Sequence, residues 1–348
     1  MKKPENILFL GETYRADAQT WIKGIQNVSG IKIDTLEVGS TKTRIGRIFN
    51  FLVFGYKIVI SNYNKSYDLV LAERATSYGF FSLFVNAKKR IVAQQGITDA
   101  WPETGLSGVY KSFLQRLVYR RVDLIHAWGK VMVPAILSSG AKTEKVMVLP
   151  KGMDLDHYNF LPLHSKEANL AIVTRSLTDV YHHKDILYAI SILKLKNRII
   201  DLIVVGDGPK MDYLKNLSFE LGLEDQVQFL GRIPNNQLPK LLQRASIFLS
   251  VPETEGVSAS LFEAMSSGCF PIVTDLPGNR AFIKSGLNGL LVPVNDSKML
   301  ANEIENYLDH SIQYEKSIVE NREFIEKSVD LKKNMEVIWE RYISIFNS

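Results

Sequence analysis

Two glutamates, Glu255 and Glu263, are the residues whose type and spacing most readily suggest chemistry. Glu255 lies in the loop between a strand-like apolar run and an apolar helical segment. Glu263 would lie about 80° further around a regular helix that began at Glu255. Carboxylates at this spacing can bracket a polyol from different directions. A helix-capping carboxylate followed by a solvent-facing one explains the same spacing equally well.

The residues between the two glutamates add hydrogen-bond donors. Gly256 allows the backbone to approach a ligand closely. The amides of the next four residues would be the unpaired donors of a helix N-terminus, which favours anions and hydroxyl-rich ligands. These four residues are Val257, Ser258, Ala259 and Ser260.

The glycine pair Gly206 and Gly208 does not indicate a dinucleotide site. The dinucleotide fingerprint needs a small residue at its sixth position, where the helix packs on the strand, and that position here is Met211. We therefore do not expect NAD(P) chemistry. The loop should still allow the backbone to approach a flat ligand.

The sequence predicts no bound catalytic metal. Asp154 and Asp156 form a D-x-D pair, but no third hard ligand lies near them, so we interpret the pair as turn and capping chemistry. The histidines show no metal-binding spacing. The single cysteine, Cys269, excludes an internal disulfide, favours a reducing compartment and is interpreted as a core residue.

Short apolar runs alternate with helical patterns along the whole chain. Most of the runs are rich in Val, Ile and Leu with little alternation, which is typical of parallel strands covered by helices on both faces. This predicts a doubly wound α/β fold. The predicted strands are 7–10, 31–38, 69–72, 90–93, 124–127, 146–149, 170–174, 202–205, 227–230, 247–250, 271–274 and 290–292.

The strand–helix pattern restarts near Leu170, after a polar stretch from Pro150 to Lys166. We therefore expect two Rossmann-like domains, residues 1–160 and 161–330, facing each other across a cleft. Residues 331–348 form a C-terminal amphipathic helix that is expected to pack back on the first domain.

The Glu255/Glu263 pair resembles the E-x7-E motif of retaining GT-B glycosyltransferases, and its context resembles that of family 4, the glycosyl transferases group 1. Five further segments resemble the motifs of this family in order and spacing, firmly in the second half of the chain and loosely in the first. They are V-M-V-L-P-K-G-M-D (146–154), V-G-D-G-P (205–209), V-Q-F-L-G-R (227–232), E-A-M-S-S-G (263–268) and N-G-L-L-V (288–292).

The resemblance implies that the first domain binds the acceptor and that the second domain binds the nucleotide-sugar. It also implies a role for each candidate site residue. Glu263 would hold the ribose hydroxyls of a nucleotide-sugar, and Glu255 would reach the hydroxyls of the transferred sugar. Arg175 would neutralise the diphosphate together with Lys184 or His182, and no metal would be needed. Other residues at the donor site would be Gly11, Gly206, Gly208, Arg232, Ile233 and the segment 256–260.

Three segments depart from the family pattern. The family's glycine pair after the strand that ends at Thr274 is here Pro277-Gly278, and the first-domain glycine loop is only Gly11-Glu12-Thr13. The region where many members place an acceptor-side histidine reads Q-Q-G-I-T-D (94–99). The resemblance therefore leaves the acceptor open.

The resemblance implies a retaining, metal-independent hexosyltransferase that uses a nucleotide-sugar as substrate, with a UDP-sugar favoured, and has no cofactor. Its acceptor would be a glycan or a lipid-linked glycan in cell-envelope polysaccharide or glycolipid synthesis. One alternative is a sugar-nucleotide epimerase of the same fold, and another is a non-catalytic basic α/β binding protein. No nucleic-acid-binding motif accompanies the basic charge.

The charge is distributed unevenly along the chain. Residues 1–160 carry 22 Lys or Arg and 13 Asp or Glu, a net charge of +9, whereas residues 161–348 carry 20 and 24, a net charge of −4. The segment Thr41–Ile60 combines basic residues with apolar residues at helical spacing, and the basic groups at 88–90, 116, 120 and 121 add to it. A buried helix with basic ends would explain the segment equally well.

The sequence contains no apolar run long enough to span a membrane. We therefore expect a cytoplasmic protein whose first domain contacts an anionic membrane surface peripherally, on the inner face of the cell membrane.

Overall fold

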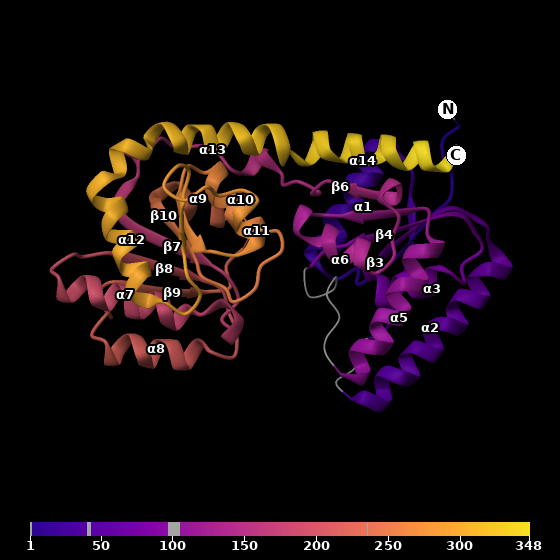
Figure 1. Cartoon of the computed structure of the whole chain (residues 1–348), viewed down its shortest axis with the longest axis horizontal. Coiled ribbons are helices and arrows are strands. Elements are labelled where there is room, and N and C mark those ends of the chain that lie inside the picture. The colour runs from indigo at the N-terminus through magenta and orange to yellow at the C-terminus, as the bar shows by residue number, and fades with distance from the viewer. Residues whose placement is uncertain (1, 40–42, 97–104, 235) are drawn as a thin grey trace. The chain divides into compact units, whose positions relative to one another are not determined.

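A computed structural model of the chain describes residues 2–39, 43–96, 105–234 and 236–348 (Figure 1). The chain divides into two compact units. Unit 1 comprises Met1–Gly152 and Leu331–Ser348, and unit 2 comprises Met153–Asp330. The division falls before the predicted boundary at residue 160, because the Met153 amide donates to the Val329 carbonyl at 2.8 Å and Met153 pairs with Asp330.

Each unit contains a six-stranded sheet in which every pairing is parallel, which confirms the predicted doubly wound fold class. All twelve predicted strands are present. The sheet of unit 1 has the order β2-β1-β3-β4-β5-β6. Its strands are β1 (Ile7–Leu10), β2 (Ile33–Leu36), β3 (Tyr67–Glu73), β4 (Ala87–Gln94), β5 (Leu124–Ala127) and β6 (Val146–Val148).

The sheet of unit 2 has the order β12-β11-β10-β7-β8-β9. Its strands are β7 (Glu167–Thr174), β8 (Asp201–Val205), β9 (Val227–Gly231), β10 (Ala245–Ser250), β11 (Phe270–Thr274) and β12 (Leu290–Val292). The helices are α7 (His183–Leu195), α8 (Met211–Glu220), α9 (Leu238–Arg244), α10 (Ala259–Ser266), α11 (Pro277–Arg280), α12 (Ser297–His310) and α13 (Glu315–Ser328).

The central strands of unit 2 are apolar on both faces because helices cover both. One face of the sheet, including Leu202 and Val204, packs against α7, α8 and α12. The opposite face, including Ile203 and Val205, packs against α9, α10 and α13. This three-layer packing explains why the strands read as continuous apolar runs in the sequence.

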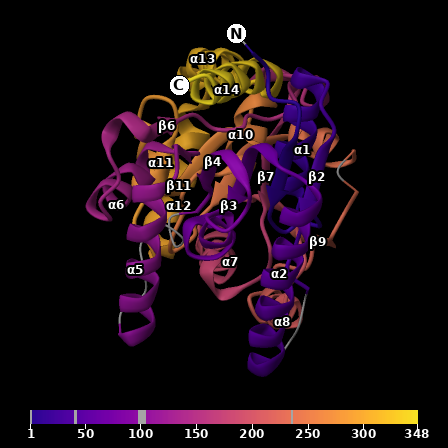
Figure 2. The same ribbon diagram turned by 90° about the vertical axis from the view of Figure 1, so that its right-hand side faces the viewer.

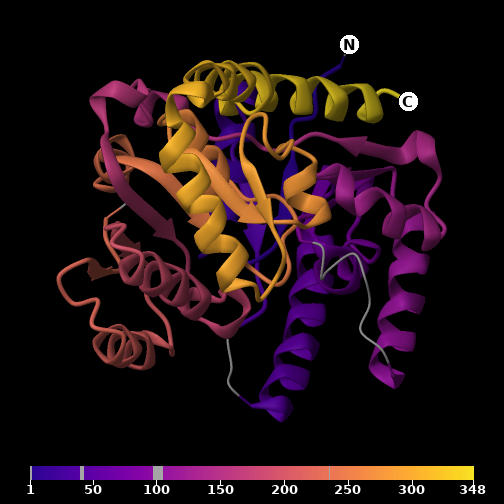
Figure 3. The same ribbon diagram turned by 60° about the vertical axis from the view of Figure 1, so that its left-hand side comes forward.

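The helices of unit 1 are α1 (Ala16–Ser29), α2 (Arg44–Asn64), α3 (Phe80–Ser82), α5 (Leu106–Arg121), α6 (Val133–Ser138) and α14 (Leu331–Phe346), and a π-helix spans Arg74–Gly79. Figure 2 and Figure 3 show that α2 and α5 extend beyond the ends of the strands of this unit. No helix among the described residues is long and apolar enough to cross a membrane.

The C-terminal helix α14 completes the core of unit 1. It packs along α1, where Gly24 makes room for the Met335 side chain, since a Cβ atom on Gly24 would lie 2.6 Å from the Met335 sulfur. Its Tyr342 reaches β5, and the tyrosine hydroxyl lies 2.9 Å from Nδ1 of the buried His126. Nε2 of His126 lies 2.8 Å from the Leu149 carbonyl, so Nε2–H donates there and Nδ1 accepts from Tyr342.

His126 should make unit 1 sensitive to acid. Burial and, to a smaller extent, the charge of nearby Lys151 lower the pKa of His126 to about 4, against the opposing effect of the hydrogen bond to Leu149. Since the unfolded chain titrates near the ordinary value of about 6.5, it binds more protons than the folded chain between pH 6.5 and 4. Stability is therefore lost as the pH falls through this window, by about 3 kcal/mol at pH 4.

The measurement is equilibrium urea unfolding of the full chain and of His126→Asn at pH 7 and at pH 4. The stability advantage of the wild-type chain over the variant should shrink by about 3 kcal/mol at the lower pH. A constant difference between the two proteins at both values would show that His126 does not titrate on unfolding.

Candidate functional site

The candidate site of unit 2 lies at the point in its sheet where the order of strand addition reverses. From β7 the chain adds β8 and β9 on one side, and then returns to add β10 on the other side of β7. Ligands of open α/β sheets bind at the carboxyl ends of strands at such a switch point. Arg175 follows β7 and Glu255 lies in the loop after β10, so the fold brings these two predicted residues together.

Arg175 and Glu255 form a largely buried ion pair. Nη2 of Arg175 contacts Oε2 of Glu255, and their side chains are only 14% and 12% exposed. The same Nη2 donates to the Ser258 hydroxyl at 2.5 Å. The guanidinium carbon also lies 5.1 Å from the ring centre of Tyr181, in a cation–π contact. Three groups therefore hold the guanidinium in one place.

The helix N-terminus predicted beside Glu255 is that of α10. Ser258 caps it, and its hydroxyl accepts from the Leu261 amide at 3.3 Å. The amides of Ala259 and Ser260 lie in the first turn, where a helix offers no backbone acceptor. The Ser260 hydroxyl donates to the Thr174 carbonyl at 3.1 Å and ties α10 to the end of β7.

The loop that carries Glu255 is fixed from two sides. Oε1 of Glu255 accepts from the Gly256 amide at 3.1 Å. Gly278, in α11, lies against this loop, and a Cβ atom there would come within 2.5 Å of the Gly256 carbonyl oxygen. The glycine of Pro277-Gly278, where the sequence departs from the family pattern, is therefore required for the close approach of α11 to the loop.

Glu263 lies in α10, and its partly buried side chain hydrogen-bonds the hydroxyl of Tyr158. Burial raises the pKa of Glu263, while the Tyr158 hydrogen bond and the charge of Arg175 oppose this rise. Burial and the neighbouring Glu263 carboxylate in turn raise the pKa of Tyr158. Glu263 thus sits where it can accept further hydrogen bonds from hydroxyl groups.

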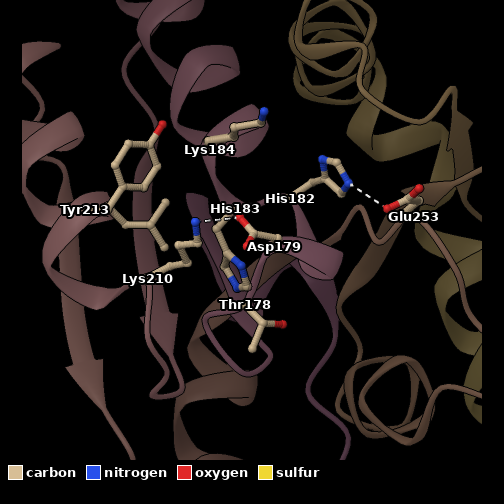
Figure 4. Close-up of a pocket in the computed structure, with 9 residues that line it drawn as sticks. Thr178, Asp179, His182, His183, Lys184, Lys210, Tyr213 and Glu253 are labelled. Atoms are coloured by element: carbon tan, nitrogen blue, oxygen red, sulfur yellow. Dashed lines mark ion pairs between the residues drawn. The ribbon is translucent and has the colours of Figure 1, made fainter.

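A pocket of about 140 Å³ lies beside this cluster, at the N-termini of α7 and α8 (Figure 4). Its lining includes both residues predicted as the second diphosphate cation, His182 and Lys184. Lys184 is exposed in the first turn of α7. Lys210 lines the pocket too, and its ammonium forms an ion pair with Asp179 at 2.8 Å.

The two histidines of the pocket differ in their surroundings. His182 has a left-handed backbone (φ 47°), and its ring lies 3.3 Å from an Asp185 oxygen and 3.7 Å from a Glu253 oxygen. His183 is 4% exposed, and neither of its ring nitrogens has a hydrogen-bond partner among the described residues. Burial, together with the neighbouring Arg175 and His182, lowers the pKa of His183 to about 4.

The glycine loop after β8 packs closely against the backbone that follows β7. Cβ atoms on Gly206 and Gly208 would collide with the backbone of Arg175 and of Leu177. Gly206 (φ 144°) also donates to the Gly231 carbonyl at 2.9 Å. These two glycines therefore allow the loop after β8 to pack closely against the loop that carries Arg175.

The remaining predicted donor-site residues follow other strands of the two sheets. Arg232 is exposed and Ile233 partly buried directly after β9. Gly11 lies at the end of β1, in unit 1, whereas the other predicted site residues are in unit 2. The D-x-D pair caps a short helix, since an Asp154 oxygen accepts from the Asp156 amide at 3.2 Å.

The sequence reasoning missed several residues that shape the site. Tyr158 and Tyr181 lie in segments without regular patterning, so no signal pointed to their contacts with Glu263 and Arg175. Lys210 could have been found, because a lysine directly after a G-D-G-P turn lies at a helix start. Glu253 and His183 line the pocket as well.

Comparison with known proteins identifies relatives of the second half of the chain. Residues 159–324 match the family described as "Glycosyl transferases group 1". The chain is 26% identical over 185 residues to the phosphatidylinositol N-acetylglucosaminyltransferase gpi3 subunit of Schizosaccharomyces pombe, covering 52% of this chain and 40% of that protein.

A second relative is the UDP-Gal:alpha-D-GlcNAc-diphosphoundecaprenol alpha-1,3-galactosyltransferase of Escherichia coli, which is 27% identical over 181 residues, covering 48% of this chain and 46% of that protein. The chain thus spans less than half the length of these two relatives. Among solved structures, Anabaena HepE in complex with UDP and glucose has the same fold, with a TM-score of 0.77, 17% identity and coverage of 98% and 99% of the two chains.

Proposed function

Since the chain belongs, through residues 159–324, to the glycosyl transferases group 1 family and has the GT-B fold, we propose that it is a retaining, metal-independent glycosyltransferase. It transfers a sugar from a nucleotide-sugar, with a UDP-sugar favoured, to a glycan or lipid-linked acceptor. The observation that carries this proposal is the Arg175–Glu255–Ser258 cluster at the switch point of unit 2.

Each part of the site has a chemical role in this proposal. The Arg175 guanidinium and the N-terminus of α10 stabilise negative charge that grows on the departing diphosphate. Glu263 accepts from the ribose hydroxyls and Glu255 from hydroxyls of the transferred sugar. Binding of the diphosphate draws Arg175 away from Glu255 and frees this carboxylate for the sugar.

We infer that Lys184 rather than His182 is the second cation for the diphosphate. The two ring nitrogens of His182 already face the carboxylates of Asp185 and Glu253. Lys184 forms no ion pair within the described part of the chain and stands exposed in the first turn of α7. Its flexible ammonium can therefore follow the diphosphate.

The comparisons support the acceptor class. The E. coli relative is named for a sugar linked to diphosphoundecaprenol, and the S. pombe relative for phosphatidylinositol. UDP accompanies the Anabaena HepE structure. We therefore propose that the reaction belongs to cell-envelope polysaccharide or glycolipid synthesis, in the cytoplasm at the inner face of the cell membrane.

Substitution of the charged donor-site residues tests the assignment. Arg175→Ala and Glu263→Gln each remove a charged hydrogen-bond partner of roughly 1.5–3 kcal/mol, so donor affinity or turnover should fall about 10- to 150-fold. Titration calorimetry with UDP and nucleotide release from UDP-sugars measure the two effects.

Arg244→Ala is the matched control, because Arg244 forms an exposed ion pair with Glu167 at the opposite end of β7. It should leave both quantities unchanged. Folded Arg175→Ala and Glu263→Gln proteins with wild-type affinity and rate would contradict the proposed donor site.

The reaction should proceed without a divalent metal, because Arg175, Lys184 and the N-termini of α7 and α10 supply the positive charge that the diphosphate needs. Nucleotide release should persist in excess EDTA and in Asp154→Asn. A complete loss that Mg²⁺ or Mn²⁺ restores would refute metal independence.

We also propose that unit 1 contacts an anionic membrane surface through α2 and α5. An exposed stripe runs along α2 at alternating spacings of three and four residues, and further exposed apolar side chains lie on α5. The residues are Phe49, Leu52, Tyr56, Val59 and Tyr63 on α2, and Val109, Tyr110 and Phe113 on α5. The buried Phe54 and Ile58 anchor α2 to the unit.

The basic residues contribute unequally to this surface. Lys57, Arg116, Arg120 and Arg121 are exposed. The structure does not favour the predicted contribution of residues 88–90 to membrane binding. Lys88 pairs with Asp68 at 2.8 Å, and Arg90 donates to backbone carbonyls. Thr41 and Lys42 lie outside the described residues, as do the side chains of Arg44, Ile45, Arg47 and Ile48.

Liposome co-sedimentation tests the membrane contact. The chain should bind anionic vesicles at low salt and dissociate at high salt, because each basic residue near such a surface contributes about 1 kcal/mol. The double variant Leu52→Glu/Tyr56→Glu should lose binding, whereas Leu195→Glu, at an exposed apolar position of unit 2, should retain it. Equal recovery on neutral and anionic vesicles, or none at low salt, would favour a soluble acceptor.

A further inference from the structure

The Glu263 carboxylate, which the proposed function assigns to the ribose, has a hydrogen-bond partner within unit 2. The hydroxyl of Tyr158 hydrogen-bonds to it, and Arg175 acts on it through its charge. A carboxylate has two oxygens and about four lone-pair positions, so Tyr158 occupies part of this capacity. The remaining positions can accept hydrogen bonds from the hydroxyls of a ligand.

The backbone and the ring of Tyr158 are both fixed. Its amide donates to the Leu155 carbonyl at 3.1 Å, and its carbonyl accepts from Nη1 of Arg322 at 2.6 Å. The ring is partly buried and packs against the apolar core on the face of the sheet that α9, α10 and α13 cover. These contacts hold the apolar body of the side chain and leave the hydroxyl for Glu263.

Arg322 of α13 joins the segment that carries Tyr158 to the helix that carries Glu263. The nitrogen that binds the Tyr158 carbonyl also donates to the Ser266 carbonyl, at the end of α10, at 2.9 Å. The Glu263 carbonyl in turn accepts from the hydroxyls of Ser266 and Ser267 at 2.8 and 3.0 Å. Both partners of the Tyr158–Glu263 hydrogen bond are therefore anchored within unit 2 before a ligand binds.

The hydrogen bond from Tyr158 favours the ionised form of Glu263. Burial raises the pKa of Glu263, and the Tyr158 hydrogen bond and the charge of Arg175 oppose this rise. Asp154 is the further charged group that faces Tyr158. An ionised carboxylate is purely an acceptor and makes stronger hydrogen bonds than a neutral acid, so this arrangement suits hydroxyl donors.

The phenol oxygen of Tyr158 can accept a hydrogen bond while its proton is donated to Glu263. Tyr158 and Glu263 together thus present acceptor atoms from two side chains next to each other. Such a pair suits two hydroxyls on adjacent carbons. A ribose carries these hydroxyls at C2′ and C3′, whereas a 2′-deoxyribose lacks the first of them.

We propose that Tyr158 is a specificity-determining residue that, together with Glu263, selects a ribonucleotide donor over its 2′-deoxy analogue. Tyr158 orients the Glu263 carboxylate toward one ribose hydroxyl and accepts from the other with its phenol oxygen. This inference rests on the proposed glycosyltransferase function and adds to it a basis for discrimination at the ribose. A 2′-deoxyribose leaves an acceptor of the pair unsatisfied, which a site built for that hydroxyl penalises.

Titration calorimetry on the full chain tests the proposal without turnover. The probes are UDP and GDP, each compared with its 2′-deoxy analogue. The wild-type chain should bind at least one ribonucleotide about tenfold or more tightly than the analogue. In Tyr158→Phe, which keeps the ring and removes the hydroxyl, ribonucleotide affinity should fall about tenfold and that of the analogue about threefold or less. A purely structural role would lower both affinities by the same factor.

The pH dependence of binding gives a second readout. Loss of the Tyr158 hydrogen bond raises the pKa of Glu263 further, so the carboxylate is protonated at a higher pH. As the pH is lowered, ribonucleotide affinity should therefore begin to fall at a higher pH in Tyr158→Phe than in the wild-type chain. Tyr188→Phe is the matched control, because Tyr188 is a partly exposed tyrosine of α7, and it should behave like the wild-type chain.

The outcomes separate this inference from the proposed function. A wild-type chain that binds a ribonucleotide and its 2′-deoxy analogue equally would overturn the inference alone. So would a Tyr158→Phe protein whose preference for the ribonucleotide and whose pH profile are unchanged. Failure of the wild-type chain to bind any of the nucleotides would instead contradict the proposed transferase.

Discussion

The constraint on which the structure depends is that both parallel sheets are covered by helices on both faces. The central strands are therefore apolar throughout, and the polar groups that their loops carry can reach a ligand only at the strand ends. Chain topology then decides which end loops become neighbours. In unit 2 the neighbours are the loops after β7 and β10, which carry Arg175 and Glu255. In unit 1 they are the loops after β1 and β3, which carry Glu12 and Arg74.

The buried Arg175–Glu255 pair follows from this constraint. A ligand that binds the guanidinium must take the place of the Glu255 carboxylate as its partner. A guanidinium that is 14% exposed needs a nearby carboxylate, because an unpaired buried charge is strongly destabilising. Ser258 and Tyr181 hold the same guanidinium, so it is already positioned before a ligand arrives. A diphosphate can replace the carboxylate as its partner, and the displaced Glu255 then gains lone pairs for hydroxyl groups. Under the proposed function, one ion pair would thus link recognition of two chemically different parts of a nucleotide-sugar.

The sequence predicted the parts of the fold and site that depend on local pattern. The twelve strands follow from apolar runs, and the segment 255–260 follows from a glycine and a serine cap before an apolar helix. The contacts of Tyr158 with Glu263 and of Tyr181 with Arg175 could not be predicted, because they join irregular segments that only the tertiary fold brings together. Gly206 and Gly208 have a packing role that the sequence pattern did not indicate. The glycines were expected to let the backbone approach a ligand, and the structure adds that they permit a close approach to the backbone at Arg175–Leu177.

The two switch points use the same pairing of arginine with carboxylate and differ in the helix that begins beside it. In unit 2, α10 has no acidic residue in its first turn, and Ser258 and the amides that follow it leave that end open to negative charge. In unit 1, Asp17 lies in the first turn of α1 and binds the Lys151 ammonium, so the positive end of this helix is already neutralised. The N-terminus of α10 is therefore open to negative charge, whereas the N-terminus of α1 already carries a carboxylate. Under the proposed function, the open N-terminus of α10 suits the site of unit 2 to the diphosphate of a nucleotide-sugar.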